Sequence, residues 1–520
     1  MKTLLVLLLV ALGTSGGQNP PVVPFEKHAE LTSDTPIDEL VFGRLKQLKI
    51  QPAGLCSDAV FVRRVYLDAI GTLPTAEEAR RFLADRDPHK RSKLVDQLLA
   101  RDEFADYWAM RWSDSLRVKA EFPINLWPNA VQAYYRWIHT SVKKNVPYDR
   151  FVREMLTASG SNFRVPAVNF YRAVQNREPK TIAAAVALAF MGARTEKWSE
   201  ERRAEMSVFF SQVGYKSTDE WKEEIIFFDA LAKPAKNGAE TVLPDGTRRR
   251  LLPGEDPRAV FADWLTRSEN PWFARNITNR VWYWLLGRGI VHEPDDLRPD
   301  NRPSNPELLA YLEEELVASK YDLKHIYRLI LNSKTYQLSC IPRTNHPDAE
   351  ANFAYYPLRR LDAEVLIDAL CQITDTTEEY SSLIPEPFTF IPREQHSVAL
   401  ADGSITSSFL ETFGRPPRDT GLMSERDNRP SAAGQLHLLN SSHIRHKIEQ
   451  SEKLRQVMRS GRNPAEKVRN LYLTILSRPP TKEELLVVRD YANSGQIKRW
   501  EVMVDLAWAL VNSAEFLYRH

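Results

Sequence analysis

The stretch from residue 270 to residue 336 carries the densest set of side chains that could do polar chemistry. Its basic and amide candidates come from one predicted helix and the turn after it: Arg275, Asn276, Asn279, Arg280 and Arg288. An arginine can bind a carboxylate through two parallel hydrogen bonds, so this set could hold an acidic ligand. It could instead pair inside the protein, with Asp295, Asp296, Asp362 or Glu425. The internal network is the favoured interpretation.

A polar loop follows that helix and offers a second kind of chemistry. It contains His292, Glu293, Asp295, Asp296, Arg298, Asp300, Asn301 and Arg302. Hard cations such as Ca²⁺ take oxygen ligands, which Asp295, Asp296, Asp300 and Asn301 could supply. The spacing is not that of an EF-hand, however, and helix caps with salt bridges explain such a loop as well. No metal site is therefore predicted.

A later irregular segment adds charges of both signs. It carries Arg415, Arg418, Glu425 and Arg426. A helix as rich in aromatic residues as 274–286 should be largely buried, and buried charges must be paired. We therefore predict that helix 274–286, loop 288–302 and segment 413–428 meet in one polar site. Arginines left without carboxylates there would mark a ligand site, and fully paired ones an internal lock.

Two further groups have a chemical and a structural interpretation. The histidines His437, His443 and His446 could ligate a metal, but two nitrogens on one helix face do not make a site without an identified third ligand. The aromatic residues Trp127, Tyr134, Tyr135 and Trp137 could stack on sugar rings. Their helical spacing favours the core.

The elements that position these side chains are mainly helical. The spacing predicts a helix up to Leu286, ended by Gly287. Asn305 before Pro306 predicts the start of the next helix, and Asp322 caps a third. Most of 35–210 is also predicted to be helical. A helix at 362–374 precedes a proline-rich irregular span at about 383–430, and further helices follow between 433 and 514, including one expected over 441–459. Two capping boxes are predicted, one from Thr75 and Glu78 and one from Thr481 and Glu484.

The pattern changes between the two helical halves. Residues 223–231 favour a strand, and the Pro244-Asp245-Gly246 turn indicates a hairpin. We predict a mainly α fold with two helical halves joined by a small β insert at about 222–252. The predicted plan is a signal peptide (1–17), a linker (18–34), an N-terminal helical domain (35–215), the insert region (216–255) and a C-terminal helical domain (256–520).

Composition limits the class of protein. Lys and Arg number 70 and Asp and Glu 68, so a dedicated nucleic-acid binder is not expected. Lys2 followed by the apolar run Leu4–Leu12 and small residues is typical of a signal peptide. We expect a periplasmic or secreted protein with no membrane span after cleavage. Three cysteines, Cys56, Cys340 and Cys371, exclude a disulfide scaffold.

Several motifs are specific enough to indicate a family. FVRRVYLDAIGTLPTAEEARRFLAD (61–85) and FADYWAMRWSDSLRV (104–118) resemble the first of two domains of unknown function named for their occurrence beside planctomycete cytochrome c domains. ARNITNRVWYWLLGRGIVHEPDDLRPDNRPSNPELLAYL (274–312) resembles the second. Further segments fit that second domain: 359–370, 413–419, 436–444, 471–485 and 505–520. The resemblance implies architecture and export, but no established reaction.

One departure from the family concerns haem. Relatives commonly carry Cys-x-x-Cys-His after a Met-Gly-x-Arg turn, whereas here Met191-Gly192-Ala193-Arg194 leads directly into Thr195. That motif attaches c-type haem, and similar spacings can hold a metal. Covalent haem is therefore not expected, and no cofactor is predicted.

The sequence leaves three functions open. No G-x-S-x-G, H-E-x-x-H, P-loop or dinucleotide motif is present, so no catalytic residue is assigned. The favoured function is a binding or scaffold component of an extracytoplasmic complex, with another exported protein or a polysaccharide as partner. The alternative is a hydrolase-type enzyme with its polar site in the second domain. A haem or metal redox protein comes third.

Overall fold

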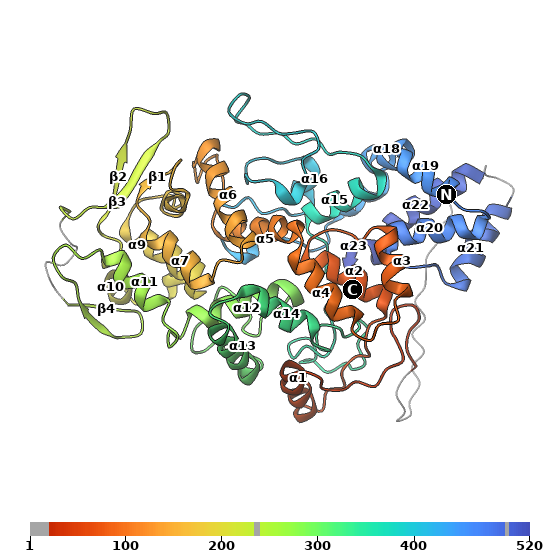
Figure 1. Ribbon diagram of the computed structural model, residues 1–520, viewed down its shortest axis with the longest axis horizontal. Coiled ribbons are helices and arrows are strands. Elements are labelled where there is room, and N and C mark those ends of the chain that lie inside the picture. Colours follow the sequence, from red (N-terminus) through yellow and green to blue (C-terminus); the bar gives the residue numbers. More distant parts are fainter. Residues whose placement is uncertain (1–19, 233–239, 495–498) are drawn as a thin grey trace.

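The fold is mainly α-helical, as predicted, with 52% helix and 6% strand. A computed structural model describes residues 20–232, 240–494 and 499–520, and the predicted signal peptide lies outside the described residues. The molecule is elongated, with the largest sheet at one end and α18–α22 at the other (Figure 1). None of the described helices combines the length and apolar character that crossing a membrane requires.

The helices of the first half follow capping signals in the sequence. Thr75 and Glu78 form the predicted capping box at the start of the third helix. The α-helices are α1 (Pro36–Gln47), α2 (Asp58–Ala69), α3 (Ala76–Ala84), α4 (Lys90–Ala100), α5 (Asp102–Ser115), α6 (Pro128–Lys143), α7 (Tyr148–Thr157), α8 (Asn169–Arg172), α9 (Pro179–Val186) and α10 (Glu200–Val208). Three short turns complete this half: η1 (Pro166–Val168), the π-helical η2 (Ala187–Met191) and η3 (Thr195–Lys197).

The β region begins earlier in the chain than the sequence predicts. Strands β1 (Gly160–Ser161), β2 (Val213–Ser217) and β3 (Glu224–Phe228) form an antiparallel sheet in the order β1-β3-β2. The predicted β insert at about 222–252 missed β2, because a five-residue strand directly after a helix gives little periodicity. The hairpin prediction is confirmed, since β4 (Glu240–Val242) pairs with β5 (Arg248–Arg250).

The second half is again helical. Its helices are α11 (Pro257–Leu265), α12 (Phe273–Leu286), α13 (Pro306–Ala318), α14 (Leu323–Asn332), α15 (Ala363–Thr374), η4 (Ser397–Ala399), α16 (Ser408–Thr412), η5 (Met423–Glu425), α17 (Ala432–Asn440), α18 (Ser442–Gln450), α19 (Glu452–Arg459), α20 (Pro464–Leu476), α21 (Lys482–Asn493), α22 (Arg499–Val511) and α23 (Ala514–Leu517). Strands β6 (Arg359–Arg360) and β7 (Tyr518–Arg519) pair antiparallel.

The helix starts predicted around the polar loop are confirmed. Asn305 accepts a hydrogen bond from Leu308 N at the start of α13, and Asp322 accepts one from His325 N at the start of α14. The single helix expected over 441–459 is wrong. Ser451 interrupts it, because its hydroxyl accepts from Leu454 N and donates to the carbonyl of Thr374.

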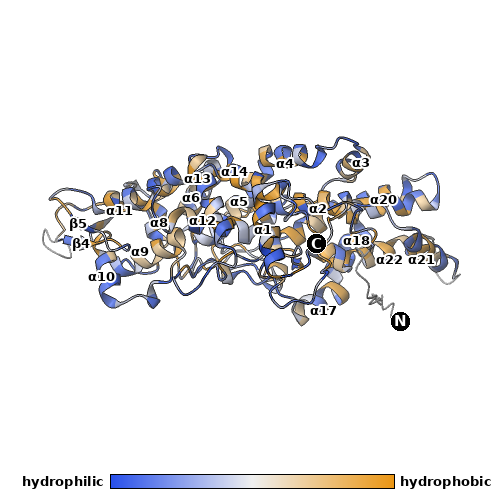
Figure 2. Cartoon of the chain, turned by 90° about the horizontal axis from the view of Figure 1, so that it is seen from below, coloured by the Kyte–Doolittle hydropathy of each residue, from blue (hydrophilic) through white to orange (hydrophobic). Residues whose placement is uncertain are grey.

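One hydrophobic core runs through both halves of the chain. The indole rings of Trp108 on α5 and Trp284 on α12 lie 5.4 Å apart within it. Arg63 of α2 also reaches the later half, donating to the carbonyls of Ile475 and Phe516. Figure 2 shows apolar and polar residues alternating along the helices, as expected for helices that bury one face. The three cysteines are free thiols.

Candidate functional site

The predicted meeting of α12, the polar loop and segment 413–428 is present in the structure. Arg280 is 0% exposed and donates to Asp295 Oδ1 at 2.9 Å. It also donates to the carbonyls of Ala189 and Leu188, each at 2.6 Å. Met423 N donates to the other oxygen of Asp295 at 2.6 Å. Both carboxylate oxygens are therefore occupied, so this junction is an internal lock.

The neighbouring residues of the predicted site serve structure or lie elsewhere. Asn279 exchanges two 2.9 Å hydrogen bonds with the backbone of Val291 and so fixes the loop against the helix. Arg275 pairs with Glu313 of α13 at 2.7 Å. Arg288 lies 3.9 Å from Glu350. His292 lies beside Glu293, with burial lowering the pKa of its ring.

The loop carboxylates proposed as calcium ligands have cationic partners in the structure. Asp296 pairs with Lys197 at 2.7 Å and with Arg298, which also pairs with Asp300. Burial alone would raise the pKa of Asp296, but these two cations bring it below the usual value. Asn301 donates to the carbonyl of Asp296 instead of turning its oxygen to a common centre.

A larger charged group lies next to this lock, and we call it the arginine cluster. It consists of seven arginines with largely buried side chains: Arg111, Arg359, Arg360, Arg415, Arg418, Arg426 and Arg519. Four buried carboxylates pair with them: Asp68, Asp114, Asp362 and Glu364. In the described part of the chain, the cations of this cluster thus outnumber the carboxylates that pair with them.

The predicted segment residues Arg415 and Arg426 are members of this cluster. Arg426 bridges Asp114 at 2.7 Å and Glu364 at 2.6 Å. Arg415 lies 3.4 Å from Glu364 and donates to the carbonyl of Asp402. Glu425 does not join, because its Oε1 accepts from Thr420 N.

The arginine cluster opens into a chamber of about 510 Å³. Its walls come from α5, α12, the polar loop, β6, β7 and segment 416–430. The charged lining residues are Arg111, Arg359, Arg360, Arg426, Arg429, Asp114, Glu293 and Asp427. Arg429 and Asp427 pair with each other at the rim, where Arg429 is exposed. The inner wall is therefore dominated by arginine, and the volume is typical of small-molecule sites.

Several donors of the inner wall have no protein acceptor. Arg111 uses Nη2 for Asp362 and Tyr107, and no described residue accepts from its Nη1. Arg360 uses Nη2 for the carbonyls of Phe413 and Asp427, and no carboxylate among the described residues lies within ion-pair distance of it. The hydroxyl of Tyr283 likewise has no hydrogen-bond partner in that part of the chain. These groups can receive an anion.

The buried carboxylates around the chamber are held ionised. Burial would raise the pKa of Asp362, but the charges of Arg111, Arg519 and Arg426 bring it well below its usual range. The pKa of Asp114 is also lowered, because Arg426 and Arg418 outweigh its desolvation. A general acid must hold a proton near neutral pH, so neither carboxylate is suited to that role.

The two remaining groups of sequence candidates lie away from the chamber. His437 Nε2 lies 3.3 Å from His443 Nδ1, and His443 pairs with Glu378, while His446 is exposed. The described residues contain no metal-binding group of three or more His, Cys, Asp or Glu. Tyr134 and Tyr135 are buried in the core.

The two tryptophans of the aromatic group differ in their surroundings. Trp137 stacks on Phe151 at 4.7 Å, at the edge of the core. Trp127 instead contacts the exposed rings of Trp221 and Phe388, at 6.4 and 5.4 Å.

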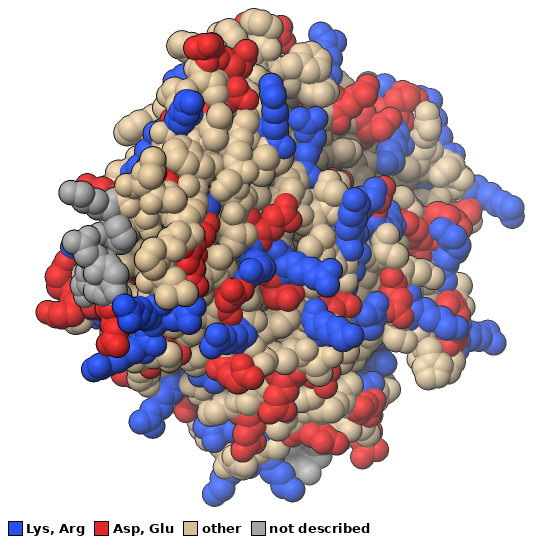
Figure 3. All heavy atoms as spheres, turned by 60° about the vertical axis from the view of Figure 1, so that its left-hand side comes forward, with Lys and Arg blue, Asp and Glu red and all other residues tan. Residues whose placement is uncertain are grey.

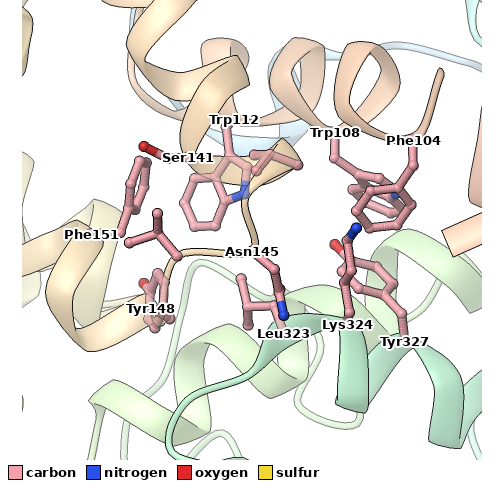
Figure 4. A pocket seen from close by; sticks show the side chains of 12 residues that line it. Phe104, Trp108, Trp112, Ser141, Asn145, Tyr148, Phe151, Leu323, Lys324 and Tyr327 are labelled. Atoms are coloured by element: carbon pink, nitrogen blue, oxygen red, sulfur yellow. The ribbon is translucent and has the colours of Figure 1, made fainter. Parts of the chain in front are cut away.

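An aromatic hollow between α5, α7 and α14 is too small for a ligand. Figure 4 shows the rings of Trp108, Trp112 and Tyr327 around it. Its volume of about 30 Å³ corresponds to roughly one water molecule. This hollow is therefore a packing feature between the two halves.

Sequence reasoning missed most of the chamber. Arg111 and Asp114 lie within the largely buried helix α5, and Arg359 and Arg360 precede the apolar helix α15. Charged residues are rarely buried unless they are paired. Their presence in a buried helix therefore indicates buried ion pairs. Their partners could not be identified, because Asp362 and Arg519 reach α5 from distant parts of the chain.

Comparison with protein families confirms the resemblance. The PSCyt2 model, a protein of unknown function (DUF1549), matches residues 36–202, and the PSD1 model, a protein of unknown function (DUF1553), matches residues 257–492. No match was found among curated proteins or among solved structures. The chain therefore belongs to the proteins that carry this pair of domains of unknown function, with the PSCyt2 domain first and the PSD1 domain second.

Proposed function

We propose that this protein is an exported binding component that takes an organic anion into the arginine-lined chamber. The observation that carries the proposal is Arg360, a 7% exposed arginine with carbonyl acceptors and no carboxylate partner in the described chain. Arg111 and Tyr283 line the same chamber. A buried cation without a counter-ion is costly, and a bound anion removes that cost.

The size and chemistry of the chamber define the ligand class. A volume of about 510 Å³ exceeds what a simple inorganic ion fills and suits a sugar-sized molecule. Two guanidinium groups and a phenol match a carboxylate, sulfate or phosphate substituent. An acidic saccharide unit combines this size with this charge, which is consistent with a polysaccharide partner.

The charge distribution on the surface is not that of a nucleic-acid-binding protein. Figure 3 shows basic and acidic side chains interspersed on the face around the sheet, with no single-sign field. The net charge of the chain is +2. Nucleic-acid binding usually needs a strongly basic stripe or patch.

A hydrolase is the second candidate, and the chamber gives it less support. Acid–base hydrolysis needs a carboxyl group that holds a proton, whereas Asp114 and Asp362 have lowered pKa values. A haem or metal redox role is third, because the sequence contains no cysteine pair spaced for covalent haem.

Calorimetric titration with D-galacturonate, galactose 6-sulfate and neutral galactose tests the proposal. We expect at least one charged sugar to bind and galactose to bind at least about tenfold more weakly, since charge-assisted hydrogen bonds contribute about 1.5–3 kcal/mol. The variant R360Q removes the unpaired charge without leaving a carboxylate unpaired, and it should weaken binding by a similar factor. The exposed Arg164, whose side chain is 83% exposed, provides the control R164Q. Equal affinity for charged and neutral sugars, or no effect of R360Q, would contradict the proposal.

Export is part of the same proposal and rests on Lys2 and the apolar run Leu4–Leu12. N-terminal sequencing of protein recovered from the periplasm or medium should show cleavage between about residues 14 and 18. Recovery of the protein in the cytoplasm with Met1 intact would contradict export while leaving the anion site open to its own test.

A further inference from the structure

A second pocket, of about 270 Å³, lies next to the chamber and shares Leu422 with it. One wall is mainly apolar and comes from α9 and η2, through Thr181, Ala184, Ala185 and Leu188. Two cationic side chains also line the pocket: Arg117, which lies just after α5, and Arg194. The pocket therefore combines an apolar wall with two cations.

Arg117 is the informative residue of this pocket. It is 6% exposed, and its Nη1 makes a long 3.4 Å hydrogen bond to the carbonyl of Thr420. Its Nε and Nη2 are buried and have no hydrogen-bond partner among the described residues. These two nitrogens form the side-on edge of the guanidinium group, which binds the two oxygens of a carboxylate through parallel hydrogen bonds. The edge suited to bidentate binding thus has no acceptor within the described part of the chain.

The nearby carboxylates do not neutralise these arginines. Asp419 and the exposed Glu196 also line the pocket. Asp419 pairs with Lys119 at 2.7 Å, and Glu196 lies within ion-pair distance of no arginine in the described part of the chain. Glu425 accepts from Thr420 N and is not within ion-pair distance of Arg117. Arg194 has no ion pair with any residue that the structure describes, and its Nε is buried without a partner. Burial lowers the pKa of Arg117 and raises that of Glu425, as expected for two groups that do not pair.

We propose that this pocket is a separate binding site for a small monocarboxylic acid with an apolar body. The carboxylate accepts from Nε and Nη2 of Arg117, with Arg194 as a second cation, and the apolar body lies against Ala184 and Leu188. The volume lies just below the usual range for drug-sized ligands, which indicates a small acid.

Benzoate and its neutral isostere benzamide are suitable probes for calorimetry on the full chain. We expect benzoate to bind and benzamide to bind at least about tenfold more weakly, because a bidentate charged pair is lost. R117Q should weaken benzoate by about tenfold or more. A184L should abolish binding of benzoate by filling the apolar side while keeping both arginines. The chamber variant R360Q should leave benzoate affinity unchanged, which separates the two sites.

Crystals soaked in 4-bromobenzoate locate the site directly, since the bromine gives an anomalous signal. A peak beside Ala184 with the carboxylate on Arg117 supports the proposal, and a peak confined to the chamber overturns it. Absence of benzoate binding, or equal affinity in wild type and A184L, also overturns it. If circular dichroism shows that R117Q does not fold, A184L and R194Q decide, because neither change removes a partner from another residue.

Discussion

Arg519 Nε lies 2.9 Å from the carboxylate of Asp68, so the last strand of the chain is ion-paired to the second helix. Both side chains are almost fully buried, and Nη2 of Arg519 also lies 2.9 Å from Asp362. Asp362 in turn pairs with Arg111 of α5. The residues that flank the chamber are thus held by charges from four separate parts of the sequence.

The first prediction concerns this connection. R519Q should lower the free energy of unfolding by about 3–5 kcal/mol, because it removes one partner from two buried carboxylates. Urea denaturation followed by circular dichroism measures the change. R429Q is the matched control, since Arg429 pairs with Asp427 in solvent and should contribute nothing measurable. A stability of R519Q equal to that of R429Q would contradict the burial of this pair.

The second prediction concerns the lock between α12 and the polar loop. R280Q leaves Asp295 buried with only the Met423 amide as a donor, so we expect a loss of about 3–5 kcal/mol. R275Q on the same helix breaks the Arg275–Glu313 pair, in which Arg275 is 44% exposed, and should change stability by less than about 0.5 kcal/mol. Thermal or urea unfolding of both variants checks this difference. Similar losses of stability in the two variants would contradict a larger contribution of the buried Arg280–Asp295 pair.

The third prediction follows from the lowered pKa of Asp362. Because this pKa is lower in the folded than in the unfolded protein, the ionised carboxylate adds stability above about pH 4. That contribution disappears as the pH falls below about 4, where the unfolded chain takes up the proton first.

The variant D362N removes this titration and makes the third prediction testable. D362N should be less stable than wild type at pH 7, and its stability should fall less steeply between about pH 4 and pH 2. Urea unfolding across this pH range gives both slopes. Parallel curves for the two proteins would contradict a lowered pKa at Asp362.

The sequence predicted local structure well, because local signals suffice for it. Asn305 and Asp322 cap helices where expected, and the hairpin at Pro244-Asp245-Gly246 forms. The break at Ser451 was missed although serine is a common N-cap residue, because the apolar spacing continues through it.

The site was predictable only in part, for a different reason. The need to pair buried arginines led correctly from Arg280 to Asp295, which is fifteen positions away. The same argument cannot find the partners of Arg111 or Arg117, because candidate carboxylates occur throughout the chain and only folding selects among them. An arginine that lacks a carboxylate, such as Arg360, is invisible in the sequence and is recognised only in three dimensions.

The last prediction concerns the backbone that shapes the chamber. Gly414 has a φ of +80°, and a Cβ added there would lie 1.8 Å from the carbonyl oxygen of Asp427. That carbonyl is part of the backbone and also accepts from Arg360 Nη2, so the clash cannot be relieved by a side-chain rotation. G414A should therefore lose stability through the strain of a left-handed alanine and through a backbone displacement, and it should weaken anion binding in the chamber.

G246A separates these two effects, because Gly246 has a φ of +89° with no described atom within 4 Å of the added Cβ. We expect G246A to lose about 1 kcal/mol and G414A clearly more, since only the second forces the chain apart. Urea unfolding and galacturonate titration of both variants test this, and equal losses with unchanged ligand affinity would show that the contact between Gly414 and Asp427 does not shape the site.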